Sequence, residues 1–405
     1  MADLYDKIAS DSHMLRVREA QSIGIYPYFR ALSQSEGVTA TIEGRDVIML
    51  GSNNYLGLTT DPRVREAMLD AVRHYGTSVT GSRFLNGTLE LHLELDRRLA
   101  EFVGKEAAVV FPTGYQTNVG TISAMVGKGD FVIVDKDDHA SIVDGCIMAR
   151  GEMKRFLHND VGSLDRVLSR LPADAGKLVV VDGVYSMMGD LAPLPELVAI
   201  CKRHGARIMV DDAHGMGVTG GGRGTSAHFD LTDEVDLIMG TFSKSFASIG
   251  GFIAGSAEAV HYIQHHARSL IFSAALPAPN VATVLKALDI MESEPQHVTN
   301  LWQNADYMRE QLKTLGYNTG ASNTPIVPVI LGEDFRVALA WHALIDAGVY
   351  TNPVVPPATP PGAGLLRTSY TATHRRKHLD QALQAFREVG ERLDFIPAPV
   401  RAGAK

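Results

Sequence analysis

Short apolar runs separated by longer amphipathic segments dominate the middle of the chain. Six of these runs are typical of buried strands: 107–111, 131–135, 178–182, 207–211, 237–239 and 252–254. Most of the segments between them are long enough for a helix. Continuous apolar strands that alternate with helices predict a mostly parallel sheet covered by helices on both faces. We therefore expect an α/β fold whose ligands gather beyond the carboxyl ends of the strands.

The pattern changes on both sides of this region. The first 45 residues predict an amphipathic arm that leads into a short extended stretch. After about residue 290, amphipathic helices flank short strands, which predicts a smaller α+β domain. Four elements carry this prediction: helices 337–347 and 377–393, and strands 326–331 and 365–368. We expect an N-terminal arm over 1–48, a large domain over 49–290 and a small C-terminal domain over 291–405.

Composition and charge exclude several classes of function. The 405 residues are 45% hydrophobic and 21% charged, with a formal net charge of −8 and no basic block, so a nucleic-acid partner is not expected. Cys146 and Cys201 are too few for a disulfide framework, and the scattered His and Asp residues lack metal-ligand spacing. No apolar run approaches the roughly 18 residues of a membrane span, and the N-terminus lacks a signal-peptide core. We expect a cytoplasmic protein without a metal, at most peripheral to the inner membrane.

Polar residues follow the ends of several predicted strands. Lys244, within the run 241–245 (TFSKS), follows a buried strand. Most lysines are simply solvated, but one at a strand exit is well placed to form a Schiff base with an aldehyde cofactor. Asp211 ends another strand and either caps a turn or meets the pyridine nitrogen of pyridoxal 5′-phosphate (PLP), where it would keep the ring protonated. Asp212 should point to the opposite face, because side chains alternate along a strand.

Further candidates follow the neighbouring strands. His139 could stack on a planar cofactor, although a lone histidine is usually structural, and His214 could hydrogen-bond the cofactor's phenolic oxygen. The run 113–115 (TGY) opens a helix, where backbone N–H groups and the helix dipole favour a phosphate, although such turns are common. Three hydroxyl groups lie near plausible phosphate positions: those of Thr241, Ser243 and Ser273.

Two further features of the sequence each allow more than one interpretation. Arg367 lies on a strand of the small domain, and its planar fork suits a substrate carboxylate as well as it suits a structural ion pair. The run 215–220 (GMGVTG) matches the dinucleotide pattern GxGxxG. That fingerprint must open a helix, and the glycines of 221–224 (GGRG) disfavour one, so we do not expect a dinucleotide site. A non-catalytic nucleotide- or acyl-binding protein is the alternative from another class.

Taken together, the motifs resemble those of the α-oxoamine synthases, which are fold-type I PLP-dependent transferases. The matching stretches, in the family's order over roughly residues 20–390, are 53–57, 80–83, 86–88, 113–115, 138–141, 182–187, 210–214, 240–245 and 356–362. The resemblance implies a large domain with a mostly parallel central sheet covered by helices and a smaller α+β C-terminal domain. It also implies a homodimer with active sites at the subunit interface.

The resemblance also implies roles for individual residues. Lys244 matches the Schiff-base lysine, Asp211 the pyridine partner and His139 the stacking histidine. Positions implied to contact the cofactor also include Gly114, Tyr115, Ser186, His214, Thr241, Ser243 and Ser273, the last reaching the phosphate of the partner subunit. Arg367 and Asn53 are implied to bind the substrate.

Within the family, the likeness is strongest to the branch that uses serine. The stretches 82–88, 185–190 and 356–362 carry it, and glycine-using members often have an acidic residue where Met188 stands. This branch condenses L-serine with a long-chain acyl-CoA (palmitoyl-CoA), loses CO2 and gives 3-ketodihydrosphingosine, the first step of sphingolipid synthesis. The alternative is a member that joins glycine or alanine to another acyl-CoA or acyl carrier protein, as do 2-amino-3-ketobutyrate CoA ligase and 8-amino-7-oxononanoate synthase.

Overall fold

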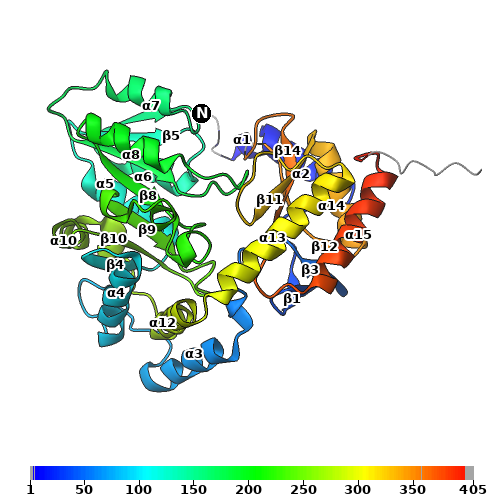
Figure 1. Cartoon of the computed structure of the whole chain (residues 1–405), viewed down its shortest axis with the longest axis horizontal. Coiled ribbons are helices and arrows are strands. Elements are labelled where there is room, and N and C mark those ends of the chain that lie inside the picture. The colour runs from blue at the N-terminus through cyan, green and yellow to red at the C-terminus, as the bar shows by residue number, and fades with distance from the viewer. Residues whose placement is uncertain (1–2, 4, 357, 397–405) are drawn as a thin grey trace, which may run out of the picture.

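The centre of the molecule is a seven-stranded sheet with the strand order β4-β10-β9-β8-β7-β5-β6 (Figure 1). The computed structural model describes residue 3, residues 5–356 and residues 358–396. The strands of this sheet are β4 (Ala107–Phe111), β5 (Phe131–Asp135), β6 (Glu152–Phe156), β7 (Lys177–Asp182), β8 (Arg207–Asp211), β9 (Leu237–Thr241) and β10 (Gly251–Gly255). Within the sheet, β10 runs opposite to the other six strands, which confirms the mostly parallel α/β architecture.

Two apolar cores lie on the two faces of this sheet. One face is covered by α5 (Gly114–Met125), α6 (Ala140–Met148), α10 (Ala257–His266) and α11 (Arg268–Ile271). The other face is covered by α4 (Glu90–Val103), α7 (Val161–Leu168), α8 (Leu194–Arg203) and α12 (Ala278–Ser293). Val109 belongs to one core and Val110 to the other. Because both faces are buried, the inner strands of the sheet are mainly apolar instead of alternating with polar residues, whereas the edge strand β6 is mostly polar.

The carboxyl ends of six strands, all except β10, lie at one edge of the sheet. β5, β6, β7, β8 and β9 are parallel, so their carboxyl ends lie together. β10 is antiparallel to both β9 and β4, which makes β4 parallel to β9 and brings its carboxyl end to the same edge. Segments far apart in the sequence therefore converge where ligands bind in folds of this kind.

The N-terminal segment packs with the C-terminal part of the chain (Figure 1). Its strands form a four-stranded sheet: β1 (Leu32–Ser35), β2 (Thr39–Ile42), β3 (Arg45–Met49) and β12 (Val349–Tyr350). A second, antiparallel sheet holds β11 (Ile326–Gly332), β14 (Gly364–Ser369) and β13 (Asn352–Val354). The helices of this part are α1 (Asp6–Ser10), α2 (Ser12–Ser22), α13 (Gln296–Leu315), α14 (Asp334–Asp346) and α15 (Arg376–Arg392). The division at residues 48 and 290 stays a prediction, and residues 397–405 lie outside the described residues.

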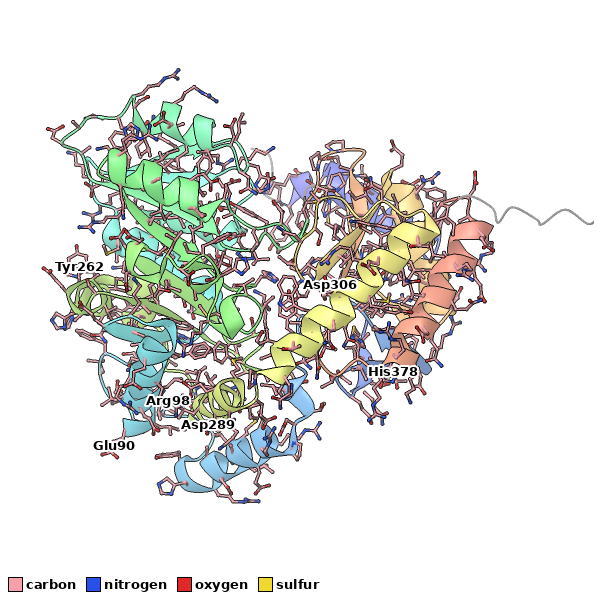
Figure 2. The ribbon with its side chains drawn as sticks, viewed as in Figure 1. Glu90, Arg98, Tyr262, Asp289, Asp306 and His378 are labelled. Atoms are coloured by element: carbon pink, nitrogen blue, oxygen red, sulfur yellow. The ribbon has the colours of Figure 1, made fainter. Side chains whose placement is uncertain are left out.

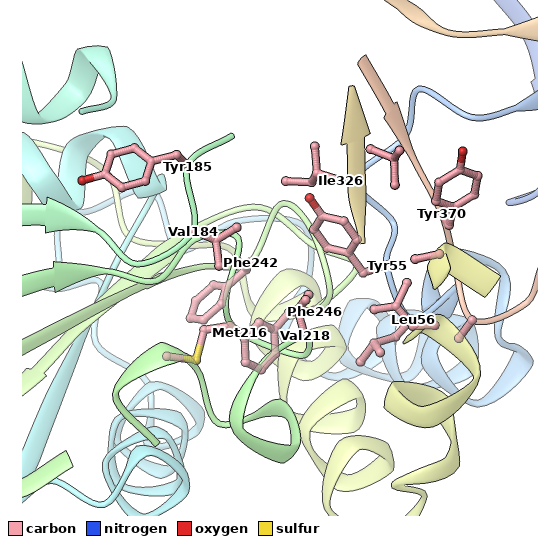
Figure 3. Packing of buried hydrophobic residues seen from close by; sticks show 14 of the residues in the cluster. Tyr55, Leu56, Val184, Tyr185, Met216, Val218, Phe242, Phe246, Ile326 and Tyr370 are labelled. Carbon is pink, nitrogen blue, oxygen red and sulfur yellow. The ribbon is translucent and has the colours of Figure 1, made fainter. Parts of the chain in front are cut away.

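Buried aromatic and aliphatic side chains join the two parts of the molecule (Figure 3). Phe242 and Phe246, just after β9, are fully buried, and their rings meet edge to face at 5.4 Å. Tyr55, Ile326 and Tyr370 belong to the same core. The segment between Phe242 and Phe246 is therefore anchored at both ends by burial.

Helices on the lower side of the view in Figure 1 are also tied together at the surface. α3 (Pro62–Tyr75) packs against α12. Arg98 of α4 forms ion pairs with Asp289 (3.1 Å) and Glu292 (2.7 Å) of α12 (Figure 2). Such partly exposed pairs typically contribute less than about 1 kcal/mol each, so the packing of apolar side chains dominates here.

Candidate active site

A cavity of about 310 Å³ lies at the carboxyl edge of the central sheet. Nine of the twelve residues predicted from the sequence line it: Gly114, Tyr115, His139, Ser186, Asp211, His214, Thr241, Ser243 and Lys244. The other three lie outside its lining and connect to it through at most one intermediate residue. Arg367 bonds the backbone of Ser186, Ser273 bonds Gln116, and Asn53 lies near Tyr55.

The Asp211 carboxylate is buried beneath this cavity and held by two donors. Its Oδ2 accepts a hydrogen bond from Asn118 Nδ2 (2.6 Å), and its Oδ1 accepts one from the backbone N–H of Ala213 (2.9 Å). Asn118 Nδ2 also donates to Ser141 Oγ (2.9 Å), which lies 2.7 Å from His139 Nδ1. A continuous hydrogen-bonded chain therefore links the Asp211 carboxylate to the His139 ring.

Asp212 faces away from the cavity. Its two carboxylate oxygens accept hydrogen bonds from the backbone N–H and the hydroxyl of Thr225 in α9 (Thr225–His228), both at 2.6 Å. Burial raises the pKa of Asp212 to about 7. The glycine-rich run 215–220 opens no α-helix and leads into the 3₁₀ helix η2 (Gly220–Gly222). These residues therefore hold the turn after β8 in place.

Lys244 follows β9 and lines the same cavity as Asp211. Burial lowers the pKa of its amine to about 8; the Asp211 carboxylate opposes this shift, and the Arg367 guanidinium adds to it. An unprotonated amine is the nucleophilic form of lysine. At pH values near 8, a large fraction of Lys244 is therefore in the reactive form.

The N-terminus of α5 opens against the end of β9. Thr113 caps the helix, its hydroxyl accepting a hydrogen bond from the backbone N–H of Gln116 (3.1 Å). A Cβ on Gly114 would lie 2.6 Å from Thr241 Oγ1, so only glycine fits at this position. Thr241 and Ser243 place hydroxyls 3.0 Å apart beside this turn. Backbone N–H groups at a helix start together with hydroxyl donors suit an anion such as a phosphate.

Arg367 approaches from β14 and is 4% exposed. Its Nε donates to the carbonyl of Ser186 (2.5 Å), and its Nη2 donates to the Tyr55 hydroxyl (3.4 Å). Within residues 5–356 and 358–396, no carboxylate forms an ion pair with it. A buried guanidinium without an anion is costly, so this arginine is suited to a carboxylate supplied by a ligand.

His214 lies between the cavity and a buried tyrosine. Its Nδ1 is 2.7 Å from the hydroxyl of Tyr55. Burial, followed by the nearby charges of Lys244 and Arg367, holds the pKa of His214 well below its usual value. The ring is therefore neutral at physiological pH.

Four residues of this site were not singled out from the sequence: Tyr55, Asn118, Ser141 and Asp182. Asn118 lies one helical turn after Gly114, so its side chain is on the same face of α5. This spacing could have indicated that Asn118 also faces the site. Asp182 pairs in register with Asp211 on the neighbouring strand and also lines the cavity. Burial, and then the charge of Asp211, raise its pKa well above the usual value.

Two negative findings apply to the part of the chain that the structure describes. None of its helices combines the length and the apolar character needed to cross a bilayer. Nor do three or more His, Cys, Asp or Glu side chains gather there in a way that could hold a metal ion. Cys146 and Cys201 are both buried and unpaired with one another.

Comparison with known proteins gives consistent matches. The model of the family "Aminotransferase class I and II" matches residues 45–386. Serine palmitoyltransferase of Sphingobacterium spiritivorum is 48% identical over 92% of this chain and 94% of its own. An 8-amino-7-oxononanoate synthase of Symbiobacterium thermophilum is 41% identical over 92% of this chain and 96% of its own. A structure of serine palmitoyltransferase from S. paucimobilis with a bound PLP-myriocin aldimine is 40% identical, with a TM-score of 0.94 over 98% of this chain and all of that one. The resemblance and the fold type expected from the sequence are thereby confirmed.

Proposed function

The chain belongs to the aminotransferase class I and II family, and we propose that it is a PLP-dependent serine palmitoyltransferase. As an acyltransferase, it would condense L-serine with palmitoyl-CoA, release CoA and CO2, and yield 3-ketodihydrosphingosine. One observation carries the proposal: a reactive amine and a buried carboxylate, on Lys244 and Asp211, line one cavity, and the buried guanidinium of Arg367, which has no carboxylate partner among the described residues, bonds the backbone of its lining residue Ser186.

The residues around the cavity fit PLP, a flat pyridine that carries an aldehyde, a phenolic oxygen and a phosphate. Gly114 leaves room for the phosphate at the start of α5, because any larger residue would meet Thr241. We assign the remaining contacts as follows: Tyr115, Thr241 and Ser243 toward the phosphate, Asp211 toward the ring nitrogen, His139 on the ring face, and Ser186 and His214 toward the phenolic oxygen. When bound, PLP supplies an electron sink for the negative charge that develops at the substrate α-carbon.

The protein's own groups then have separate tasks. Lys244 Nζ would hold the aldehyde of bound PLP and, when free, would accept the α-proton of serine; its pKa of about 8 leaves a usable unprotonated fraction at neutral pH. Asp211, fixed by Asn118 and the Ala213 N–H, keeps a proton at the ring nitrogen. Arg367 binds the serine carboxylate, with Asn53 nearby on the substrate side.

We also propose a homodimer with its active sites at the subunit interface. Large apolar side chains are exposed around the cavity: Tyr115 and Ile249 line it, and Phe272, 73% exposed, precedes Ser273. Exposed apolar side chains grouped beside a polar site indicate a surface that another protein covers. In the dimer, Ser273 would reach the phosphate held by the partner subunit. Sedimentation equilibrium should give twice the mass of one chain.

The location of the enzyme is proposed to be cytoplasmic, with at most peripheral contact with the inner membrane. The long-chain substrate and product are amphiphilic, so an enzyme that handles them has a reason to visit a membrane surface. Cell fractionation tests this: the protein should be in the supernatant or be released from membranes by salt. Release only by detergent would contradict it.

The pKa of Lys244 predicts how the protein takes up its cofactor. Below about pH 8 the amine is mostly protonated, so the rate of PLP capture by cofactor-free protein should rise about tenfold per pH unit from pH 6 and level off near pH 8–9. Stopped-flow absorbance follows the capture. A rate that still climbs through pH 10, as expected for an ordinary lysine, would contradict the assignment.

Replacement of Arg367 tests the carboxylate site. Arg367→Ala should lower kcat/KM for serine about 10- to 100-fold, because a charge-assisted hydrogen bond contributes ~1.5–3 kcal/mol. The KM for palmitoyl-CoA should stay within about twofold. Arg376→Ala, an exposed arginine on α15, is the matched control and should leave both values unchanged. Equal losses in the two variants would make Arg367 structural.

A product assay tests the proposed function itself. The purified protein is incubated with serine, glycine or alanine, each paired with palmitoyl-CoA, a short acyl-CoA or an acyl carrier protein thioester. The masses of the products are measured by mass spectrometry. We expect the main product from serine and palmitoyl-CoA. A main product from alanine would instead place the chain with the 8-amino-7-oxononanoate synthases, to one of which it is 41% identical.

A further inference from the structure

The Tyr55 hydroxyl lies at the meeting point of three site residues. Tyr55 is fully buried, and its oxygen is 2.7 Å from His214 Nδ1. Arg367 Nη2 donates to the same oxygen at 3.4 Å, and Asn53 Oδ1 lies at 3.4 Å from it. The phenol therefore has one cationic donor and two potential acceptors around it.

The number of available protons decides which group is the donor and which the acceptor in each of these hydrogen bonds. A guanidinium has only donors, so Arg367 must use a lone pair of the phenolic oxygen. The phenol has a single proton, which can go to His214 Nδ1 or to Asn53 Oδ1. The distance to His214 Nδ1, 2.7 Å, is shorter than the 3.4 Å to Asn53 Oδ1. The proton of Tyr55 is therefore directed to the imidazole.

We propose that Tyr55 is a positioning residue that fixes His214 in the tautomer with its proton on Nε2. An imidazole that accepts at Nδ1 must carry its proton on the other nitrogen while it is neutral. Among the described residues, nothing forms a hydrogen bond with Nε2, and His214 lines the cavity. The tautomer therefore presents a permanent N–H donor to a ligand oxygen. Naming that oxygen as the phenolic oxygen of PLP rests on the proposed function.

The surroundings of His214 support a neutral ring. Burial and the positive charges of Lys244 and Arg367 disfavour a second proton on the imidazole and lower its pKa. The remaining freedom is the choice between the two neutral tautomers. Without the Tyr55 hydroxyl, the ring could place its proton on Nδ1 and turn a lone pair toward the cavity. That form would repel an oxygen ligand instead of binding it.

Nitrogen-15 NMR of histidine-labelled enzyme tests this assignment. The signals of His214 are identified by their loss in His214→Gln. In the PLP-loaded enzyme we expect a protonated Nε2 and a bare, hydrogen-bonded Nδ1. In Tyr55→Phe, part of the population should carry the proton on Nδ1, so the averaged Nδ1 signal should move upfield and the Nε2 signal downfield. The dissociation constant of PLP should rise about threefold to tenfold, the effect of one hydrogen bond.

Tyr370→Phe is the matched control, because Tyr370 is equally buried and its hydroxyl bonds only Thr368 within the described residues. Tyr370→Phe should lose about as much thermal stability as Tyr55→Phe and should leave the His214 signals unchanged. A wild-type His214 with its proton on Nδ1, or a Tyr55→Phe variant in which Nδ1 stays bare (its signal unchanged or moved downfield), would overturn the proposal. A protein that binds no PLP would refute the proposed function, while the Nδ1 signal would still decide the role of Tyr55.

Discussion

Lys244→Ala is expected to lower kcat for the condensation of serine with palmitoyl-CoA by at least about a thousandfold. The variant loses both the amine that holds the aldehyde and the base that accepts the α-proton. A positioned proton acceptor alone contributes ~10²–10⁴-fold to a rate. The assay is product formation at saturating substrates, and the same samples are passed through gel filtration and scanned for visible absorbance. The variant should come through colourless.

The matched control for this variant is Lys128→Ala, which removes an exposed lysine on the turn after α5. It should keep the yellow colour and the wild-type rate. Thermal melting of both variants without added cofactor should agree with that of the cofactor-free wild type. A colourless Lys244→Ala protein that condenses its substrates at the normal rate would refute the role of Lys244.

Asp211→Asn should lower kcat about 10²–10³-fold while PLP still binds. The amide has the shape of the carboxylate but no negative charge, so it cannot hold a proton on the ring nitrogen. Removal of one preorganised electrostatic group at a reacting centre typically costs about this much. Steady-state kinetics measure the loss, and the absorbance spectrum shows whether the cofactor is present.

Asp212→Asn provides a comparison on the same strand end. Asp212 bonds Thr225 and faces away from the cavity, so its replacement should lower thermal stability by about 1–2 kcal/mol through a weakened hydrogen bond. Its kcat should stay within about threefold of wild type. If Asp212→Asn lost more activity than Asp211→Asn, the two carboxylates would have been assigned the wrong way round.

The central sheet could be predicted because the apolar character of its strands can be recognised from a few consecutive residues. Strands buried on both faces are apolar without interruption, and this signal is visible in any short window of sequence. Alternation along β8 likewise separates Asp211 from Asp212 without knowledge of the rest of the fold. β6 escaped this reasoning, because its residues Glu152–Phe156 lie at the edge of the sheet and only Phe156 is buried.

Contacts between distant segments could not be predicted from the sequence. β3 pairs with β12, about 300 residues later, and such short strands carry no sequence signal that identifies their partners. The hydrogen bond between Tyr55 and His214 joins positions 159 residues apart. The hydrogen bond from Asn118 to Asp211 could not be predicted either, because it depends on how α5 lies over the sheet. These residues were within recognisable motifs, but only the three-dimensional arrangement gives them a partner.

The most direct test of the account is the site at which PLP is attached. The purified holoenzyme is reduced with borohydride, digested and mapped by mass spectrometry. We predict that the phosphopyridoxyl group is on the peptide that contains Lys244 and on no other. Attachment to a different lysine, or a reduced protein without any attached group, would contradict the account.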